Sequence, residues 1–113
     1  MAARTRKLHN PPVARNREPI LEVLRHVLPE TGELLEIGCG SGEHAIFLAP
    51  HFPGLTWRPT DLDPDMVAST AAWLEDEGPA NIVAPQVFDL LSGSWPVDAC
   101  DAVVCINVIH ISP

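Results

Sequence analysis

The stretch "LLEIGCGSGEHA", residues 34–45, limits the fold of this chain more than any other segment. An apolar run leads directly into three glycines at alternate positions, Gly38, Gly40 and Gly42, and a segment with helical periodicity follows. Glycine tolerates unusual backbone angles and removes side chains that would keep a ligand away from the backbone. The helix behind such a loop also offers free N–H groups. The pattern therefore predicts a strand, a tight glycine loop and a helix, with a ligand held close to the loop.

The rest of the chain continues this alternation. Helical spacing of apolar residues predicts helices at 17–28, 42–52 and 64–78, and short apolar runs predict strands at 33–38, 55–61, 81–90 and 101–109. Pro85 lies inside the third of these strands and suggests an edge position. Alternating helices and strands indicate βαβ units and a parallel sheet, so the predicted fold class is α/β. Residues 1–16 lack periodicity and are expected to form an extended basic arm.

The distribution of charge is uneven. Six of the seven basic residues fall within the first 25 positions, and from His26 onward a single basic residue, Arg58, stands against thirteen acidic residues. A body this acidic repels phosphate backbones, so nucleic acid is an unfavourable partner. A cationic small molecule suits it better. The basic arm is expected either to contact an anion or to lie across the acidic body.

The sequence also predicts a cytoplasmic protein without a metal site. The sequence has no run of about 18 apolar residues, the length needed to span a membrane. The basic N-terminus has no apolar segment behind it that could act as a secretory signal. Cys39, Cys100 and Cys105 lack the spacing of a disulfide framework or a zinc site. We expect them to be buried, reduced thiols.

The residues around the glycines indicate the kind of ligand. A phosphate-binding loop would end in Gly-Lys-Ser or Gly-Lys-Thr, which is absent. A dinucleotide-binding fingerprint would place its third glycine at position 43, where this chain has Glu43. Glu43 and Glu36, which precedes the first glycine by two residues, are both unfavourable beside a pyrophosphate. The loop fits a ligand that carries an ammonium or sulfonium group.

Two further acids follow predicted strands. Asp61 ends the second strand, 19 residues after Gly42, where a carboxylate can accept hydrogen bonds from two ribose hydroxyls. Asp63 is an alternative for this role, and Asp65 is expected to cap the following helix. Asp89 follows the third strand and is placed to accept a hydrogen bond from an adenine amino group. The carboxyl ends of parallel strands share one edge of the sheet, where ligands of open α/β sheets bind.

Four segments in this order, "LLEIGCGSG", "PTDLDPDM", "VFDLL" and "DAVVCINVIHIS", resemble successive motifs of the class I S-adenosylmethionine-dependent methyltransferases. "ARNREPILEVL" and "INVIHISP" further resemble a group of methyltransferase-like proteins of the methyltransferase-like 26 type. The resemblance covers residues 14–113. It implies a Rossmann-like domain over residues 17–113, a parallel sheet with strand order 3-2-1-4 and helices on both faces, and S-adenosyl-L-methionine as cofactor.

The family's sheet has seven strands, whereas four are counted here. We therefore expect the chain to be truncated at its C-terminus. The alternative is that the exposed edge of the apolar fourth strand pairs with another chain, which would allow self-association.

The resemblance also assigns roles to individual residues. It implies cofactor contacts from Glu36, Gly38, Gly40 and Gly42 to the methionine part, Asp61 to the ribose, Leu62, Asp89 and Leu90 to the adenine, and Asn107 beneath the transferable methyl group. His110 is the candidate general base, with a structural or substrate-positioning role as the alternative. The segment of Arg15, Asn16 and Arg17 is hypothesised to fold over the cofactor site and to pair one guanidinium with a carboxylate of the cofactor or substrate, or else to form a solvated helix start.

The sequence thus favours an enzyme that transfers a methyl group from S-adenosylmethionine to an unidentified small molecule. A non-catalytic cofactor-binding or scaffold module is the first alternative. A nicotinamide-dependent oxidoreductase domain is the second, and Glu43 argues against it.

Overall fold

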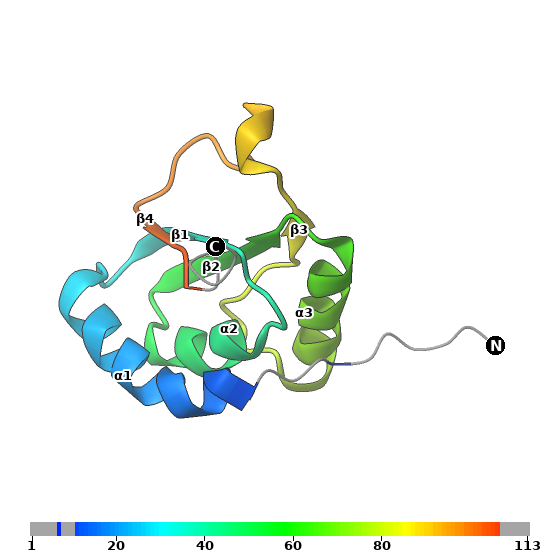
Figure 1. Cartoon of the computed structure of the whole chain (residues 1–113). Helices are drawn as coiled ribbons and strands as arrows, with labels where there is room; N and C mark the ends of the chain where they lie inside the picture. The colour runs from blue at the N-terminus through cyan, green and yellow to red at the C-terminus, as the bar shows by residue number, and fades with distance from the viewer. Residues whose placement is uncertain (1–6, 8–10, 107–113) are drawn as a thin grey trace.

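The computed structural model describes Lys7 and residues 11–106, with backbone only for residues 11–16. Its elements follow the alternation that the sequence predicts (Figure 1). The helices are α1 (Pro11–Val27), α2 (Glu43–Leu48) and α3 (Pro64–Glu77), with 3-10 turns η1 (Ala49–His51) and η2 (Leu90–Ser92). The strands are β1 (Gly32–Ile37), β2 (Leu55–Asp61), β3 (Gln86–Val87) and β4 (Ala102–Val104).

The four strands form one parallel sheet in the order β3-β2-β1-β4. β1 is central and pairs with β2 along its whole length, from Gly32 opposite Leu55 to Ile37 opposite Thr60. On its other side it pairs with the three residues of β4. The predicted α/β class and the predicted strand order are confirmed. β2 and β3 are added on one side of β1, whereas β4 is added on the other side. The order of the strands along the sheet therefore reverses direction between β3 and β4.

All three helices lie on one side of the sheet (Figure 1). The steps from β1 to β2 and from β2 to β3 run in the same direction, so right-handed crossovers place α2 and α3 on the same face. The connection from β3 to β4 returns over the opposite face and carries η2 in place of an α-helix. Among the described residues, this face thus carries the 3-10 turn η2 and no α-helix.

The core lies between this helical layer and the sheet. Apolar side chains of α1 and α2 pack against the strands; the fully or almost fully buried members are Leu21, Leu24, Leu34, Ala45, Leu48, Ala49, Leu55, Trp57 and Val104. Each large side chain of this kind stabilises the fold by about 1.5–3 kcal/mol on burial. In β1 the neighbouring Leu34 and Leu35 point to opposite faces and both are buried. This burial on both faces is typical of an interior parallel strand.

Prolines explain two of the predicted boundaries that are wrong. α1 begins at Pro11 rather than at residue 17, so residues 11–16 are helical rather than part of an extended arm. Proline is favoured in the first turn of a helix because its missing N–H has no partner there. The third strand is only Gln86–Val87 because Pro85 cannot donate to a ladder. Before it, Ile82 forms an isolated bridge to Trp57.

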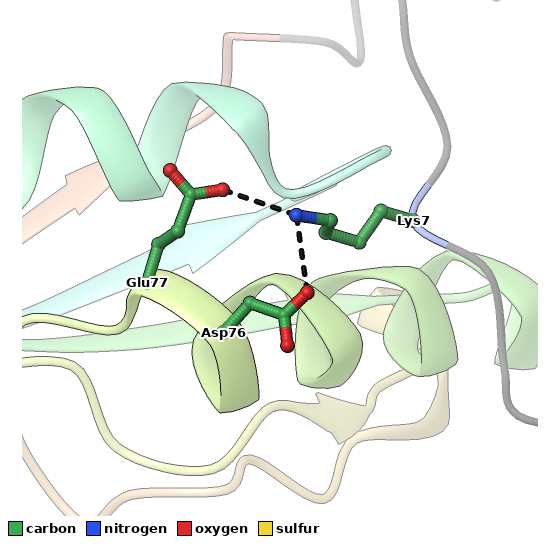
Figure 2. A network of polar contacts seen from close by, with 3 residues as sticks. All are labelled: Lys7, Asp76 and Glu77. Carbon is green, nitrogen blue, oxygen red and sulfur yellow. Dashed lines mark hydrogen bonds and ion pairs between the residues drawn. The ribbon is translucent and has the colours of Figure 1, made fainter.

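Lys7 attaches the N-terminal segment to the end of α3 (Figure 2). Its ammonium group lies 3.1 Å from Asp76 Oδ2, 3.1 Å from Glu77 Oε2 and 4.3 Å from the ring centroid of Trp73. Hydrogen bonds to the two carboxylates raise the pKa of Lys7. A cation is also favoured at the C-terminal end of a helix by the helix dipole. At this residue the basic segment lies against the acidic body.

β4 occupies one edge of the sheet, and Val103 is half exposed. Self-association through this edge stays a prediction. Within the part of the chain that the structure describes, no helix has both the length and the apolar character needed to cross a bilayer.

Candidate functional site

The glycine loop follows β1 and leads into α2. Gly38, Gly40 and Gly42 have φ angles of 76°, 59° and 98°, all in the region that side chains rarely adopt. Gly42 is restricted by packing as well, because a Cβ atom there would lie 2.8 Å from the Cα of Thr70 in α3. The glycines are therefore required for different reasons. Gly42 allows the loop to touch α3, and its backbone angle starts α2.

Hydrogen bonds hold the loop to β2 and α3. The N–H of Cys39 donates to the carbonyl of Thr60 at 2.8 Å. Ser69 Oγ donates to the carbonyl of Ser41 at 2.7 Å. The Cys39 thiol lies 3.2 Å from Thr70 Oγ1. Burial raises the pKa of this thiol to about 12. The loop is therefore a fixed feature of the fold, and Cys39 is a neutral, packed thiol.

The other two cysteines differ from the expectation of buried thiols. Both are free, but Cys100 is only partly buried and Cys105 is exposed. The prediction of buried thiols is right for Cys39 alone. Cys105 comes directly after the short strand β4, where the backbone leaves the sheet.

Asp61 connects the glycine loop to the start of α3. Its Oδ2 accepts a hydrogen bond from the N–H of Gly40 at 2.9 Å, and its Oδ1 accepts one from the N–H of Asp63 at 3.0 Å. Each carboxylate oxygen has a second lone pair for a further donor. Asp63 caps α3, with Oδ1 accepting from the N–H of Asp65 at 2.8 Å. The predicted cap at Asp65 is wrong, since Pro64 is the first residue of the helix.

A cavity of about 420 Å³ opens beside these groups, at the carboxyl ends of β1, β2 and β3. Its lining consists of Ile37, Gly38, Gly40, Asp61, Leu62, Asp63, Met66, Phe88, Asp89, Leu90 and Leu91. The volume falls in the usual range of about 300–1,000 Å³ for small-molecule sites. Apolar side chains dominate the wall, and three carboxylates interrupt it. The carboxyl edge of the strands is where open α/β sheets bind their ligands.

The cavity brings together most of the cofactor-binding residues that the sequence suggests. Six of them line it: Gly38, Gly40, Asp61, Leu62, Asp89 and Leu90. Asp89 also caps η2, because its Oδ1 accepts from the N–H of Leu91 at 2.9 Å. Gly42 is absent from this wall.

Glu36 is the most unusual acid near the site. Its side chain is fully buried, and its Oε1 accepts a hydrogen bond from Trp57 Nε1 at 3.0 Å. Its Oε2 has no hydrogen-bond partner among the described residues. Burial raises the pKa of Glu36 to about 7; the indole hydrogen bond lowers it, and the negative charge of Asp61 adds to the rise. Glu36 does not line the cavity, although Gly38 two residues later does.

The family described as "Protein of unknown function (DUF938)" matches residues 7–113. The chain belongs to the DUF938 family. Its α/β structure has the Rossmann-like methyltransferase fold, and its structural neighbours are class I S-adenosylmethionine-dependent methyltransferases of low sequence identity.

Three solved structures illustrate the similarity. Coclaurine N-methyltransferase bound to N-methylheliamine and SAH has a TM-score of 0.68 at 13% identity, over 82% of this chain and 27% of that one. YjhP from E. coli has a TM-score of 0.64 at 23% identity, over 93% and 41%. CalS10, a SAM-bound amino pentose methyltransferase from Micromonospora echinaspora, has a TM-score of 0.59 at 25% identity, over 81% and 35%. The DUF938 chain spans less than half the length of each.

Arg17 lies away from the glycine-loop cavity. Its guanidinium carbon lies 4.8 Å from the ring centroid of Phe47, and both residues line a second cavity of about 510 Å³ on the helical side. The side chains of Arg15 and Asn16, and all of Asn107 and His110, lie outside the described residues. Their suggested roles in the DUF938 chain stay predictions.

Sequence reasoning missed several residues of the DUF938 site. Ile37, Met66, Phe88 and Leu91 also line the cavity. Their positions next to the ends of predicted strands, or in the first turn of α3, are the signal that could have found them. Trp57 has no such signal, since its contact with Glu36 depends on how β1 and β2 align.

Proposed function

We propose that this DUF938 chain binds S-adenosylmethionine and forms the cofactor-binding part of a methyltransferase that acts on a small molecule. One observation carries the proposal: a cavity at the carboxyl edge of the sheet is lined by six residues that the sequence suggests as cofactor contacts. The fold shared with methyltransferases that were solved with SAM or SAH supports it.

The residues present fit the chemistry of this cofactor. S-adenosylmethionine carries a sulfonium and an ammonium group, and Asp61, Asp63 and Asp89 supply negative charge on the cavity wall. The partnerless Oε2 of Glu36 suits a cationic group in particular. The glycines allow close approach to the backbone, and Asp61 retains lone pairs for ribose hydroxyls. Leu62 and Leu90 offer apolar contacts to an adenine ring, with Asp89 as acceptor for its amino group.

When bound, the cofactor supplies an activated methyl group for in-line displacement by a nucleophile. The chain's own task is then to orient the cofactor and exclude water. We assign Asn107 to the region beneath the methyl group, and His110 to general base or acceptor positioning. The guanidinium of Arg15 remains the candidate for pairing with a carboxylate over the site, with Asn16 in the same segment.

Calorimetric titration of S-adenosylmethionine and S-adenosylhomocysteine into the chain tests the proposal. We expect saturable binding by the wild type, weakened about tenfold or more in Asp61→Ala, because hydrogen bonds to a charged group contribute about 1.5–3 kcal/mol. Asp98→Ala is the matched control, since Asp98 is an exposed acid outside the cavity. Absence of binding by the folded chain, equal affinity in Asp61→Ala, or binding of NAD instead would contradict the proposal. Cofactor binding without transfer to any acceptor would favour the non-catalytic module.

A further inference from the structure

Glu36 is buried with one oxygen satisfied and the other without a partner. Trp57 Nε1, the only polar atom of its side chain, donates to Oε1, and no described group reaches Oε2. A buried carboxylate in this state is costly, because its charge is neither solvated nor paired. Two conditions remove the cost: a proton on the carboxyl group, or a cation brought to it.

The charged groups around Glu36 do not supply that cation. Asp61 at the end of β2 is negative and opposes ionisation of Glu36. Cys39 in the loop and Cys105 after β4 both have raised pKa values and stay neutral. Arg58 from β2 forms its ion pair with Glu33 at 2.6 Å. At the start of α2, neither Glu43 nor the buried His44 donates to Oε2 of Glu36. The charged side chains described on α1 are exposed, away from the buried carboxyl group.

We infer that Glu36 holds a proton in the free chain and releases it when a cationic ligand binds beside the glycine loop, with Trp57 as the positioning residue for its carboxyl group. The inference rests on the proposed function. The change is a loss of the carboxyl proton to solvent, after which the ligand's ammonium or sulfonium charge balances the carboxylate. Two residues link this ionisation to the cavity that they line: Gly38, two positions after Glu36, and Asp61, whose negative charge acts on Glu36.

Proton release on binding is the first test. Titration of S-adenosylhomocysteine in phosphate and in Bis-Tris, which differ in ionisation enthalpy, reports the protons released. Below about pH 7 we expect the release of close to one proton per bound ligand. The affinity should weaken by up to about tenfold for each unit by which the pH is lowered further. The ligand's own ammonium stays charged in this window, because α-amino groups titrate at about 7.7–8.0.

Two controls isolate Glu36. Glu36→Gln removes the titrating proton, so binding by this variant should lose its pH dependence. 5′-Methylthioadenosine has the nucleoside and the thioether but lacks the ammonium group, so it should bind without proton release. A wild-type chain that binds S-adenosylhomocysteine with no proton release overturns the inference and leaves the proposed function standing. Absence of binding at every pH overturns both.

The indole N–H of Trp57 gives a spectroscopic test in the free chain. It donates to Glu36, so its NMR chemical shift should titrate with a midpoint near the pKa of about 7 in the wild type and stay constant in Glu36→Gln. Trp57→Phe identifies this resonance among the three indole signals. In folded Trp57→Phe, S-adenosylhomocysteine should bind about tenfold more weakly while 5′-methylthioadenosine binds as before. A pH-independent indole shift, or equal weakening of both ligands, would overturn the role of Trp57.

Discussion

The N–H of Gly40 donates to Asp61 Oδ2 at 2.9 Å, so the second glycine of the loop is fixed by the residue that ends the neighbouring strand. The same carboxylate accepts from Asp63, the cap of α3. A single side chain thereby sets the distance between two walls of the cavity. The site is a product of sheet topology, because parallel pairing of β1 and β2 brings both strand ends to one edge.

Gly42 and Gly93 form a matched pair for testing the loop. Both have positive φ, 98° and 78°, but only Gly42 is crowded: a Cβ atom there would lie 2.8 Å from Thr70 Cα, whereas one at Gly93 would meet nothing within 4 Å. Gly93→Ala should cost about 1–2 kcal/mol of unfolding free energy for backbone strain alone. Gly42→Ala should cost about 1–3 kcal/mol more, since α2 and α3 must separate. Urea unfolding measures both, and equal losses would contradict the packing role of Gly42.

Asn81 is expected to matter for stability, although no sequence motif singles it out. Its Nδ2 lies within 3.1 Å of the carbonyls of Ala49, Phe52 and Leu55, and so ties η1 to the start of β2. Asn81→Ala should destabilise the chain by about 1–3 kcal/mol, because it removes the side-chain hydrogen bonds to these carbonyls, although the carbonyls of Ala49 and Phe52 each keep a backbone N–H donor. Asn81→Asp should be worse, since an acceptor then faces the carbonyls. A thermal melt in which Asn81→Asp matches the wild type would contradict this.

The stability of the free chain should fall as the pH rises through Glu36's titration range. The folded chain raises the pKa of Glu36 from 4.5 to about 7, so between these values the folded state keeps a proton that the unfolded state has lost. The contribution is full below the ordinary pKa and disappears above about 7. The loss is on the order of 3 kcal/mol. Urea unfolding at a series of pH values measures it.

Glu36→Gln is the control for that series. The amide does not titrate, so the variant should lose the decline between about pH 5 and 7. Glu33 acts in the opposite direction. Its pKa is lowered by Arg58, so its contribution is lost only as the pH falls below that range. A wild-type chain whose stability is flat or rises over this window would show that Glu36 is ionised when buried.

Local patterns predict some elements well and others poorly, for identifiable reasons. The strand predicted at 55–61 is β2, Leu55–Asp61, because breakers lie close to both of its ends, Gly54 before it and Pro64 after it. The start of α1 escapes prediction because Pro11 and Pro12 resemble chain breakers, although first-turn prolines need no N–H partner. α-Helices on both faces of the sheet would require an α-helix in the connection from β3 to β4, and that connection holds only η2.

The site divides in the same way. The places of Gly38, Asp61 and Asp89 are predictable because each follows a strand, and parallel strands end at one edge. The pairing of Glu36 with Trp57 joins residues 21 positions apart through the β1–β2 register. No local pattern contains that register. The signal for the cap of α3 is present in the sequence, since a proline at the first helical position makes the preceding Asp63 the cap rather than Asp65.

The most direct test of the central claim is to map S-adenosylhomocysteine onto the chain by amide NMR chemical-shift changes. We predict saturable shifts at Gly38, Gly40, Leu62 and Leu90, which line the cavity at the carboxyl edge, and none at Arg17 or Glu77, which line the cavity on the helical side. Shifts confined to the helical side, or no shifts in the folded chain at saturating ligand, would contradict the assignment of this cavity as a cofactor site.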